Sequence, residues 1–322
     1  MRQFWKDLCY SCMMGLLLPG MVLSMGLAMF GKSGENVEPT VAQIVQQQEK
    51  TQTVIPVLTD DGIVEMELKD YLTGVVLAEM PVFFEPEAHK AQAVVARTYT
   101  LRAASGKSKH DSAVVCTDSA CCQGYLSEAD YLARGGSPEG VEQIRSAVEA
   151  TEGQVLLYEG ELIEATYFSC SGGYTEDAVA VWGTDVPYLQ SVASPGEEHA
   201  THYSDTITFD CDSFLDLLDL QSGESPKSWI GEIRYTAGGG VDTIEICGEV
   251  FRGTEVRKAL GLRSAAFSIE VKENTLEITT RGYGHRVGMS QYGADAMAAS
   301  GSDYRDILAH YYRGTTLGRL SD

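Results

Sequence analysis

An uncharged run of residues near the amino terminus is the feature that most constrains how this chain can fold. A run of this length and composition is typical of a segment in the hydrocarbon core of a bilayer. Residues 13–31 contain no charged side chain over 19 positions. A helix of that length spans about 29 Å, close to the thickness of the hydrocarbon core. Arg2 and Lys6 precede the run, and Lys32 alone follows it closely. By the positive-inside rule, we predict a transmembrane anchor at 13–31 with residues 1–12 in the cytoplasm.

A cleaved signal peptide is the alternative interpretation of the same run. Gly26-Leu27-Ala28 has the small-x-small pattern of a cleavage site. The run is long for a signal-peptide core, which favours the retained anchor. In both interpretations the remainder of the chain is exported.

The charge balance excludes one class of partner. The chain has 24 Lys and Arg against 46 Asp and Glu, a net charge of -22. Nucleic-acid phosphates would be repelled, so we expect no nucleic-acid partner. With 44% hydrophobic and 22% charged residues, the chain is expected to fold.

The chain divides into a polar segment and a folded part. Residues 32–53 are rich in glutamine and lack apolar periodicity, so we predict an extracytoplasmic stalk. Over 54–322, strand-like and helix-like segments alternate without the repeat of a doubly wound sheet. We therefore predict one α+β domain of mixed helices and antiparallel strands.

Turn and capping residues place the predicted elements. Asp60-Asp61-Gly62 predicts a hairpin between 54–58 and 62–68. Further strands are expected within 155–158, 162–168, 230–237, 241–247 and 266–282. Helices are expected over 68–78, 86–105, 138–150, 209–220, 255–260 and 303–313, the last capped by Ser302.

Residues 71–102 carry the first candidate functional group. Glu79 precedes a Met-Pro pair at a helix end, among apolar neighbours. Desolvation raises the pKa of a carboxyl group, and a protonated glutamic acid can donate to a glycosidic oxygen. Lys90 and Arg97 are seven positions apart and share one helix face. An ordinary solvated helix face beside a surface glutamate gives the same pattern.

Residues 281–297 form a second candidate group, in which four glycines are mixed with polar and aromatic residues. Glycines let the backbone approach a ligand, while His285, Ser290 and Gln291 offer contacts and Tyr292 can stack on a sugar. A tight turn before a helix explains the glycines equally well. It does not explain the density of polar donors.

Cysteines form the third group. Cys9 and Cys12 precede the predicted anchor, and six cysteines follow it: Cys116, Cys121, Cys122, Cys170, Cys211 and Cys247. An even number of exported thiols is typical of disulfides. However, His110, Cys116 and Cys122 are spaced by six, and Cys121 can complete a tetrahedral N/S shell for Zn²⁺. Such a closed site would be structural, and a disulfide is the alternative.

These motifs resemble the stage II sporulation protein D family. The phrase GVVLAEMP followed by EAHKAQAVVARTY, and GYGHRVGMSQYGA near the carboxyl end, match the family's signatures almost residue for residue. The segments CTDSACCQGY, TYFSCSGGYTE and ILAHYYRGT extend the resemblance over about 54–317.

The resemblance implies a substrate groove and a peptidoglycan lytic transglycosylase, which cuts between N-acetylmuramic acid and N-acetylglucosamine of denuded strands and leaves 1,6-anhydro ends. Glu79 occupies the position of the catalytic acid/base. The implied groove residues are Lys90, Gln92, Arg97, Tyr167, Ser169, Ser171, His285, Ser290, Gln291 and Tyr292.

The resemblance also implies zinc at His110, Cys116 and Cys122, with Cys121 where a second histidine is expected. Arg286 replaces a glycine that is usual in the family. The implied partners are glycan strands, the sporulation amidase (stage II sporulation protein P) and stage II sporulation protein M. The implied location is the mother-cell membrane during engulfment, with the catalytic domain outside the cytoplasm.

Two rival functions fit the same residues. The cysteine loop could be the active centre of a zinc hydrolase that cuts wall peptides. Alternatively, the protein could be a non-catalytic wall-binding scaffold that recruits an amidase.

Overall fold

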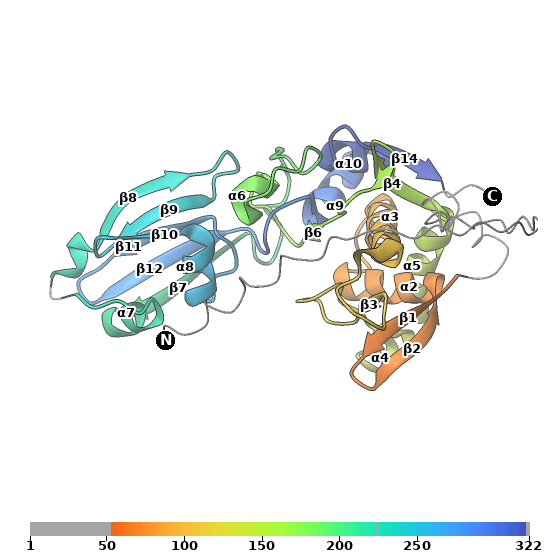
Figure 1. Cartoon of the computed structure of the whole chain (residues 1–322), viewed down its shortest axis with the longest axis horizontal. Coiled ribbons are helices and arrows are strands. Elements are labelled where there is room, and N and C mark those ends of the chain that lie inside the picture. The colour runs from red at the N-terminus through yellow and green to blue at the C-terminus, as the bar shows by residue number, and fades with distance from the viewer. Residues whose placement is uncertain (1–52, 223, 320–322) are drawn as a thin grey trace, which may run out of the picture. The chain divides into compact units, whose positions relative to one another are not determined.

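A computed structural model describes residues 53–222 and 224–319 (Figure 1). The predicted anchor at 13–31 lies outside the described residues, as does nearly all of the predicted stalk, so both stay predictions. Within the described ranges, the helices are all too short or too polar to cross a membrane. Helices and mostly antiparallel strands alternate irregularly there, which confirms the α+β prediction.

The described helices lie in both halves of the chain. They are α2 (Leu68–Glu79), α3 (Pro86–Arg102), α4 (Glu128–Ala133), α5 (Pro138–Ala150), α6 (Ala178–Trp182), α7 (Cys211–Leu217), α8 (Gly253–Ala259), α9 (Gln291–Ala299) and α10 (Tyr304–Tyr311). Two short turns of other helical types are η1 (Ala103–Lys107) and η2 (Pro226–Ser228).

The strands form small separate sheets. In the sheet β2-β1-β3 they are β1 (Val54–Thr59), β2 (Gly62–Glu67) and β3 (Val115–Cys116). In β14-β4-β5 they are β14 (Thr316–Arg319), β4 (Gln154–Tyr158) and β5 (Glu161–Leu162). A parallel pair joins β13 (Met289–Ser290) to β6 (Tyr167–Phe168), and β1 pairs with β3 in parallel. These two pairs depart from the antiparallel prediction.

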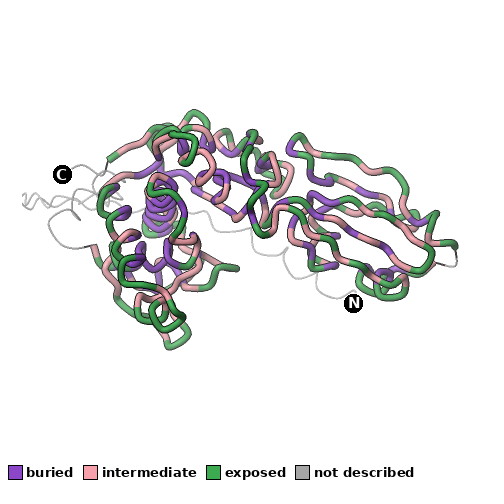
Figure 2. Tube along the Cα trace, turned by 180° about the vertical axis from the view of Figure 1, so that it is seen from behind, coloured by how far each residue is buried: buried purple, intermediate pink, exposed green. Residues whose placement is uncertain are grey.

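Helix α3 is the buried centre of the part that carries Glu79. Figure 2 shows it buried along most of its length, in agreement with its exposures. The predicted inward stripe is confirmed, since Ala88, Ala91, Val94, Val95 and Thr98 are all fully buried. Small side chains let α2, α5, α9, α10 and β4 all pack against this one helix.

Arg97 belongs to this core and does not reach a solvated face. Its Nη1 donates to the carbonyl oxygens of Thr151 (2.7 Å) and Gln154 (3.2 Å), and its Nη2 donates to that of Val148 (2.9 Å). The last carbonyls of a helix lack helical partners, so the guanidinium satisfies the end of α5. Burial lowers the pKa of Arg97 to about 10. The arginine therefore joins α3 to α5.

Residues 204–281 form an inserted substructure with its own core (Figure 1). One sheet, β10-β9-β8, contains β8 (Ile230–Tyr235), β9 (Val241–Ile246) and β10 (Glu249–Arg252). The other, β11-β12-β7, contains β7 (Ser204–Asp210), β11 (Phe267–Val271) and β12 (Thr275–Arg281). Side chains of both sheets and of α7 and α8 share the core, among them Phe214, Ile244, Val256 and Ile278.

Three predicted elements differ from the structure. The helix expected over 209–220 begins only at Cys211, because Phe209 pairs with Leu276 in the sheet and Asp210 caps the helix by accepting from the Ser213 amide. The cap of α10 is Asp303 and not Ser302. The strand expected over 162–168 is divided into β5 and β6. Strand pairing with β12 delays the start of α7, whereas the cap of α10 is a local hydrogen bond from the backbone to Asp303.

Replacing Arg97 by methionine should destabilise the fold. The substitution keeps apolar volume but leaves three carbonyls beneath α3 without their donor, so we expect the free energy of unfolding to fall by about 3 kcal/mol. Urea denaturation measures it. Lys90→Met on the same helix is the control, expected to stay within about 0.5 kcal/mol of the parent. Equal stability of both variants would contradict this role.

Candidate functional site

Glu79 lies at the carboxyl end of α2, where Pro81 prevents the helix from continuing. Its partly buried carboxylate accepts a hydrogen bond on each oxygen. The amide of Gly124 donates to Oε1 at 2.7 Å, and Gln291 Nε2 approaches Oε2 at 3.4 Å. Two segments that are far apart in the sequence therefore hold this carboxyl group from both sides.

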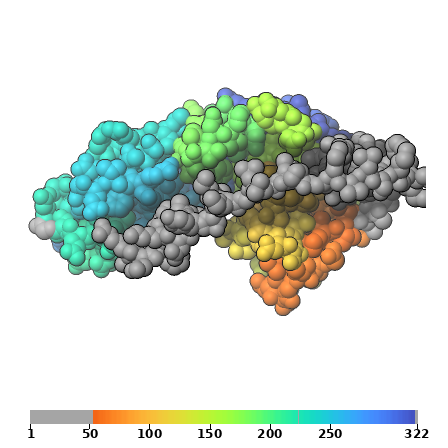
Figure 3. Space-filling model, in the orientation of Figure 1, coloured from red at the N-terminus to blue at the C-terminus, as the bar shows by residue number. Residues whose placement is uncertain are grey.

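A cleft of about 710 Å³ opens beside Glu79. One wall belongs to the cysteine loop, residues 109–122, and another to residues 164–169 together with Trp182, Tyr283 and His285. Figure 3 shows the loop, in yellow, and the segment that contains α6, in green, on the same face of the molecule. Of the residues expected in a groove, Tyr167, Ser169, His285 and Gln291 line this cleft with Glu79.

Tyr167 supplies a neutral hydroxyl group beside Glu79 in the cleft. Burial raises the pKa of Tyr167 well above its usual value, and the negative charge of Glu79 raises it further. The phenol therefore keeps its proton. Its oxygen lies 3.5 Å from Gln123 Oε1, and Gln123 Nε2 in turn donates to Thr100 Oγ1 at 3.0 Å.

The cysteine loop brings four candidate metal ligands together. His110, Cys116, Cys121 and Cys122 each offer one ligand atom, and these atoms lie within 4.8 Å of one another. His110 Nε2 lies 3.4 Å from Cys122 Sγ and 3.7 Å from Cys121 Sγ, and the two sulfurs are 3.9 Å apart. Zinc–sulfur bonds of about 2.3 Å place ligand atoms of a tetrahedron about 3.8 Å apart. The six described cysteines are all free thiols.

Two serines expected in the groove are instead fully buried on Glu197. Ser171 Oγ donates to Glu197 Oε2 at 2.7 Å and Ser290 Oγ donates to Oε1 at 2.5 Å. The amides of Ser171 and Gly172 also donate to Oε2. Ser290 Oγ accepts from the Gly293 amide and so caps α9. Both serines hold the backbone beside the cleft and do not face it.

Four further residues expected in the groove lie outside the cleft lining. The guanidinium of Arg97 donates to a carbonyl near the end of α5, and Lys90 forms an ion pair with Glu87. Gln92 is fully buried, and its amide has no hydrogen-bond partner among the described residues. Tyr292 packs edge to face on Phe84, with ring centroids 4.9 Å apart. Arg97 and Gln92 are buried in the core, whereas Lys90 and Tyr292 are partly exposed but do not line the cleft beside Glu79, so a groove role for these four stays a prediction.

Sequence comparison gives the chain a family. A family model described as "Stage II sporulation protein" matches residues 60–158. Stage II sporulation protein D of Bacillus amyloliquefaciens is 40% identical, over 80% of this chain and 76% of that protein. The chain belongs to the stage II sporulation protein D family. The protein of that name from Bacillus subtilis (strain 168) is 36% identical over 98% of this chain and 96% of its own length.

A more distant relative has a different name. The "Amidase enhancer" of Bacillus subtilis (strain 168) is 29% identical over 76% of this chain, which covers 40% of that protein.

Arg286, at the position where the resemblance implies a glycine, has a backbone conformation that favours glycine. Its φ is +65°, in the left-handed region that side chains rarely adopt. The buried guanidinium compensates with four contacts. Nε donates to the Ser171 carbonyl, Nη1 to Glu176 Oε1, and Nη2 to the carbonyls of Tyr174 and Gly238. The arginine thus ties the glycine-rich turn to the inserted substructure.

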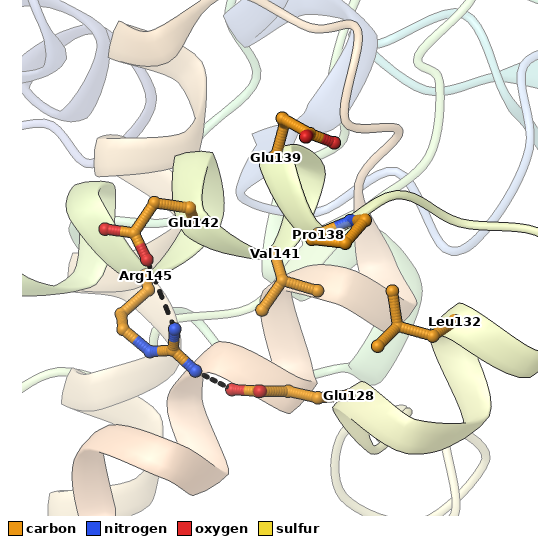
Figure 4. Close-up of a pocket in the computed structure, with 7 residues that line it drawn as sticks. All are labelled: Glu128, Leu132, Pro138, Glu139, Val141, Glu142 and Arg145. Atoms are coloured by element: carbon orange, nitrogen blue, oxygen red, sulfur yellow. Dashed lines mark hydrogen bonds and ion pairs between the residues drawn. The ribbon is translucent and has the colours of Figure 1, made fainter.

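A second pocket, of about 450 Å³, lies between α4 and α5 (Figure 4). Arg145 is held there by Glu128 and Glu142. Glu139 also lines the pocket, outside this pairing.

Several aromatic residues that the sequence did not predict also line the cleft. They include Tyr99, Phe168 and Trp182. Tyr99 lies in the segment EAHKAQAVVARTY, whose helical spacing does not mark it as a cleft residue, and Trp182 belongs to a five-residue helix outside the motifs quoted above. Only folding brings them together.

His285 is a neutral imidazole at the cleft wall. Its Nδ1 accepts from the Val287 amide at 3.1 Å, so Nε2 carries the proton. Its ring lies against Phe168 and Trp182, with centroids 5.7 Å and 5.3 Å away. Burial, and to a smaller extent the positive charge of Arg257, lower its pKa to about 4.

This depressed pKa predicts a loss of stability in acid. Between about pH 6.5 and about pH 4 the unfolded chain binds a proton at His285 that the folded chain does not. Stability should therefore fall as pH falls through this window, by at most about 1.4 kcal/mol per pH unit for this histidine. Urea denaturation across the window should give a shallower dependence for His285→Gln. Burial also lowers the pKa of His89, which leaves a residual slope. An unchanged slope in the variant would contradict the assignment.

Proposed function

We propose that the protein is a peptidoglycan lytic transglycosylase that cleaves denuded glycan strands at the outer face of the mother-cell membrane during engulfment. The observation that carries the proposal is the placement of Glu79, with a protein donor on each carboxylate oxygen, at the edge of an open cleft. Membership in a family of sporulation proteins supports the biological setting.

A single available carboxyl group favours transglycosylation over hydrolysis. Glycoside hydrolases generally use two carboxyl groups, one as the acid and one as the base or nucleophile. Glu164 is the other acid among the described residues that line the cleft, and its carboxylate pairs with Arg102 at 3.5 Å. Glu79 therefore has to perform both proton transfers.

The reaction needs no water. Glu79 in its protonated form gives its proton to the glycosidic oxygen as the bond between that oxygen and C1 of N-acetylmuramic acid breaks. The resulting carboxylate takes the proton of the C6 hydroxyl as the C6 oxygen bonds to C1. A 1,6-anhydro ring and a free hydroxyl on N-acetylglucosamine result, and Glu79 is again protonated.

The residues around Glu79 serve this cycle. The amide of Gly124 and the Gln291 side chain fix the carboxyl group, so that it keeps one orientation through both transfers. Tyr167 keeps its proton and can donate to the substrate or to the carboxylate. Ser169 and neutral His285 add uncharged polar contacts along the cleft.

The donors of the cysteine loop fit a structural zinc. The distances among His110, Cys121 and Cys122 match a tetrahedral shell, and Cys116 supplies the fourth ligand. With four protein ligands, a bound zinc would have no open coordination position for substrate, and it would make the loop more rigid. Gly124, which donates to Glu79, follows Cys122 by two residues. The loop therefore sets the position of one donor to the catalytic carboxyl group.

Glu79→Gln should abolish glycan cleavage. Glutamine keeps the shape but carries no transferable proton, so we expect turnover on amidase-stripped sacculi to fall by about 10²–10⁴-fold, the usual contribution of a general acid. Mass spectrometry of released 1,6-anhydro products measures it. Glu85→Gln, at a nearby exposed position outside the cleft, is the matched control and should keep full activity.

Glu164→Gln separates the two mechanisms. A transglycosylase with one carboxyl group should keep most of its activity in this variant. A two-carboxyl hydrolase that uses Glu164 should release reducing ends as the parent protein and should lose this activity in the variant. Parental activity in Glu79→Gln would remove Glu79 from the mechanism.

The purified protein should carry about one zinc per chain, measured by atomic emission. Cys122→Ser should lose the metal and lower the thermal midpoint, because the loop loses its tether. Activity should fall in proportion to the loss of loop order, seen as faster amide exchange at Gly124. Loss of activity on chelation with unchanged exchange at Gly124 would favour the rival zinc hydrolase. A Cys116–Cys122 disulfide by mass spectrometry would reject the zinc site.

The relative named amidase enhancer favours a second role in which the protein also stimulates the sporulation amidase, stage II sporulation protein P. That amidase would supply the stripped strands, and stage II sporulation protein M would be a membrane partner. Glu79→Gln should retain amidase stimulation if this scaffold role is independent of cleavage.

A further inference from the structure

Trp182 presents an unusual apolar surface to the cleft. Its side chain is 44% exposed although large aromatic residues are usually buried, and it lines the same cleft as Glu79. Tyr283 is a second exposed aromatic residue in that lining, at 39%. Exposure of two large rings beside one cleft is typical of a binding site.

The short helix that carries Trp182 is fixed on several sides. Gly183 ends α6 in a left-handed conformation, with its amide donating to the Val179 carbonyl at 2.9 Å. Arg252 Nη2 donates to the Ala180 carbonyl at 2.7 Å, and Asp177 Oδ1 accepts from the Ser191 amide at 2.8 Å. Because the backbone is already held, little conformational entropy remains to be lost on binding.

The imidazole ring of His285 packs against the indole of Trp182 within the cleft. The centroid of His285 lies 5.3 Å from that of Trp182, with the planes at 53°. His285 is neutral, so no charge adjoins the indole from this side. Lys109 is the one cation in the described cleft lining, and it donates to the carbonyl of Cys121 on the cysteine loop.

We propose that Trp182 is the stacking platform of a sugar subsite in this cleft, distinct from the group around Glu79. The C–H face of a pyranose ring carries partial positive charge and fits the negative face of an indole. Serine and threonine side chains of the same cleft, Ser119, Thr166 and Ser169, supply partners for the sugar's hydroxyl and acetamido groups. The scarcity of cations and the net charge of -22 disfavour phosphate-bearing ligands.

The subsite rests on the proposed function for the identity of its ligand, a glycan strand. Its role is to hold the strand, not to transfer protons. Substitution at Trp182 should therefore change KM and leave kcat near the parental value.

Two measurements test the subsite. In the full-length chain, Trp182→Ala should raise KM for stripped glycan strands about tenfold with kcat within about twofold, whereas Trp182→Phe, which keeps a ring, should raise it less. Tryptophan emission provides a binding readout in the Glu79→Gln background, which prevents turnover. The chain contains only Trp5, Trp182 and Trp229, and Trp229 is 4% exposed. Strand binding should shift the emission in Trp229→Phe but not in Trp182→Phe.

The outcomes separate this inference from the proposed function. Cleavage with a parental KM in Trp182→Ala, or an emission shift that survives in Trp182→Phe, overturns the subsite and leaves the transglycosylase intact. A Trp182-dependent shift, together with no anhydro product from the protein with Glu79 intact, supports the subsite and overturns the transglycosylase. An emission shift produced by free stem peptides and not by stripped strands overturns the sugar assignment.

Discussion

The hydrogen bond from the Gly124 amide to Glu79 Oε1 is the contact on which the site depends. At 2.7 Å it joins the end of α2 to the segment that follows the cysteine loop. A Cβ atom at position 124 would lie 2.9 Å from that same oxygen, closer than real Cβ atoms approach. A side chain at position 124 would therefore displace the oxygen that accepts this hydrogen bond. A peptide N–H has a fixed direction, so it constrains the carboxyl group more tightly than a flexible side chain would.

Buried charges position the remaining backbone around the cleft. Glu197 accepts from Ser171, Ser194 and Ser290, and so holds the backbone after β6 beside the start of α9. Arg286 and Glu176 join the turn before β13 to the inserted substructure. A buried charge is costly unless hydrogen bonds satisfy it, and several donors or acceptors meet each of these groups. The glycines in these segments allow the close approach of backbone that such networks require.

Local sequence signals predicted much of the fold and part of the site. The hairpin at Asp60-Asp61-Gly62, the apolar stripe of α3 and the extent of α5 follow from turn residues, spacing and a proline at the helix start. The cysteine cluster also follows from its spacing. By contrast, helical periodicity cannot distinguish a cationic groove face from a buried arginine, which is why Arg97 was misplaced. Glu197 and Trp182 were not predicted, since the partners that place them at the cleft, Ser290 and His285, lie about a hundred residues further along the chain.

The central claim is that one carboxyl group performs both proton transfers while the substrate supplies its own nucleophile. Isotope labelling tests this claim most directly. Amidase-stripped sacculi are digested in water enriched in heavy oxygen. The masses of the released glycan fragments, which carry no stem peptides, are then measured by mass spectrometry. Transglycosylation should leave anhydro ends that contain no heavy oxygen, because no water molecule attacks C1. Reducing ends that carry heavy oxygen at C1 would show hydrolysis and would contradict it.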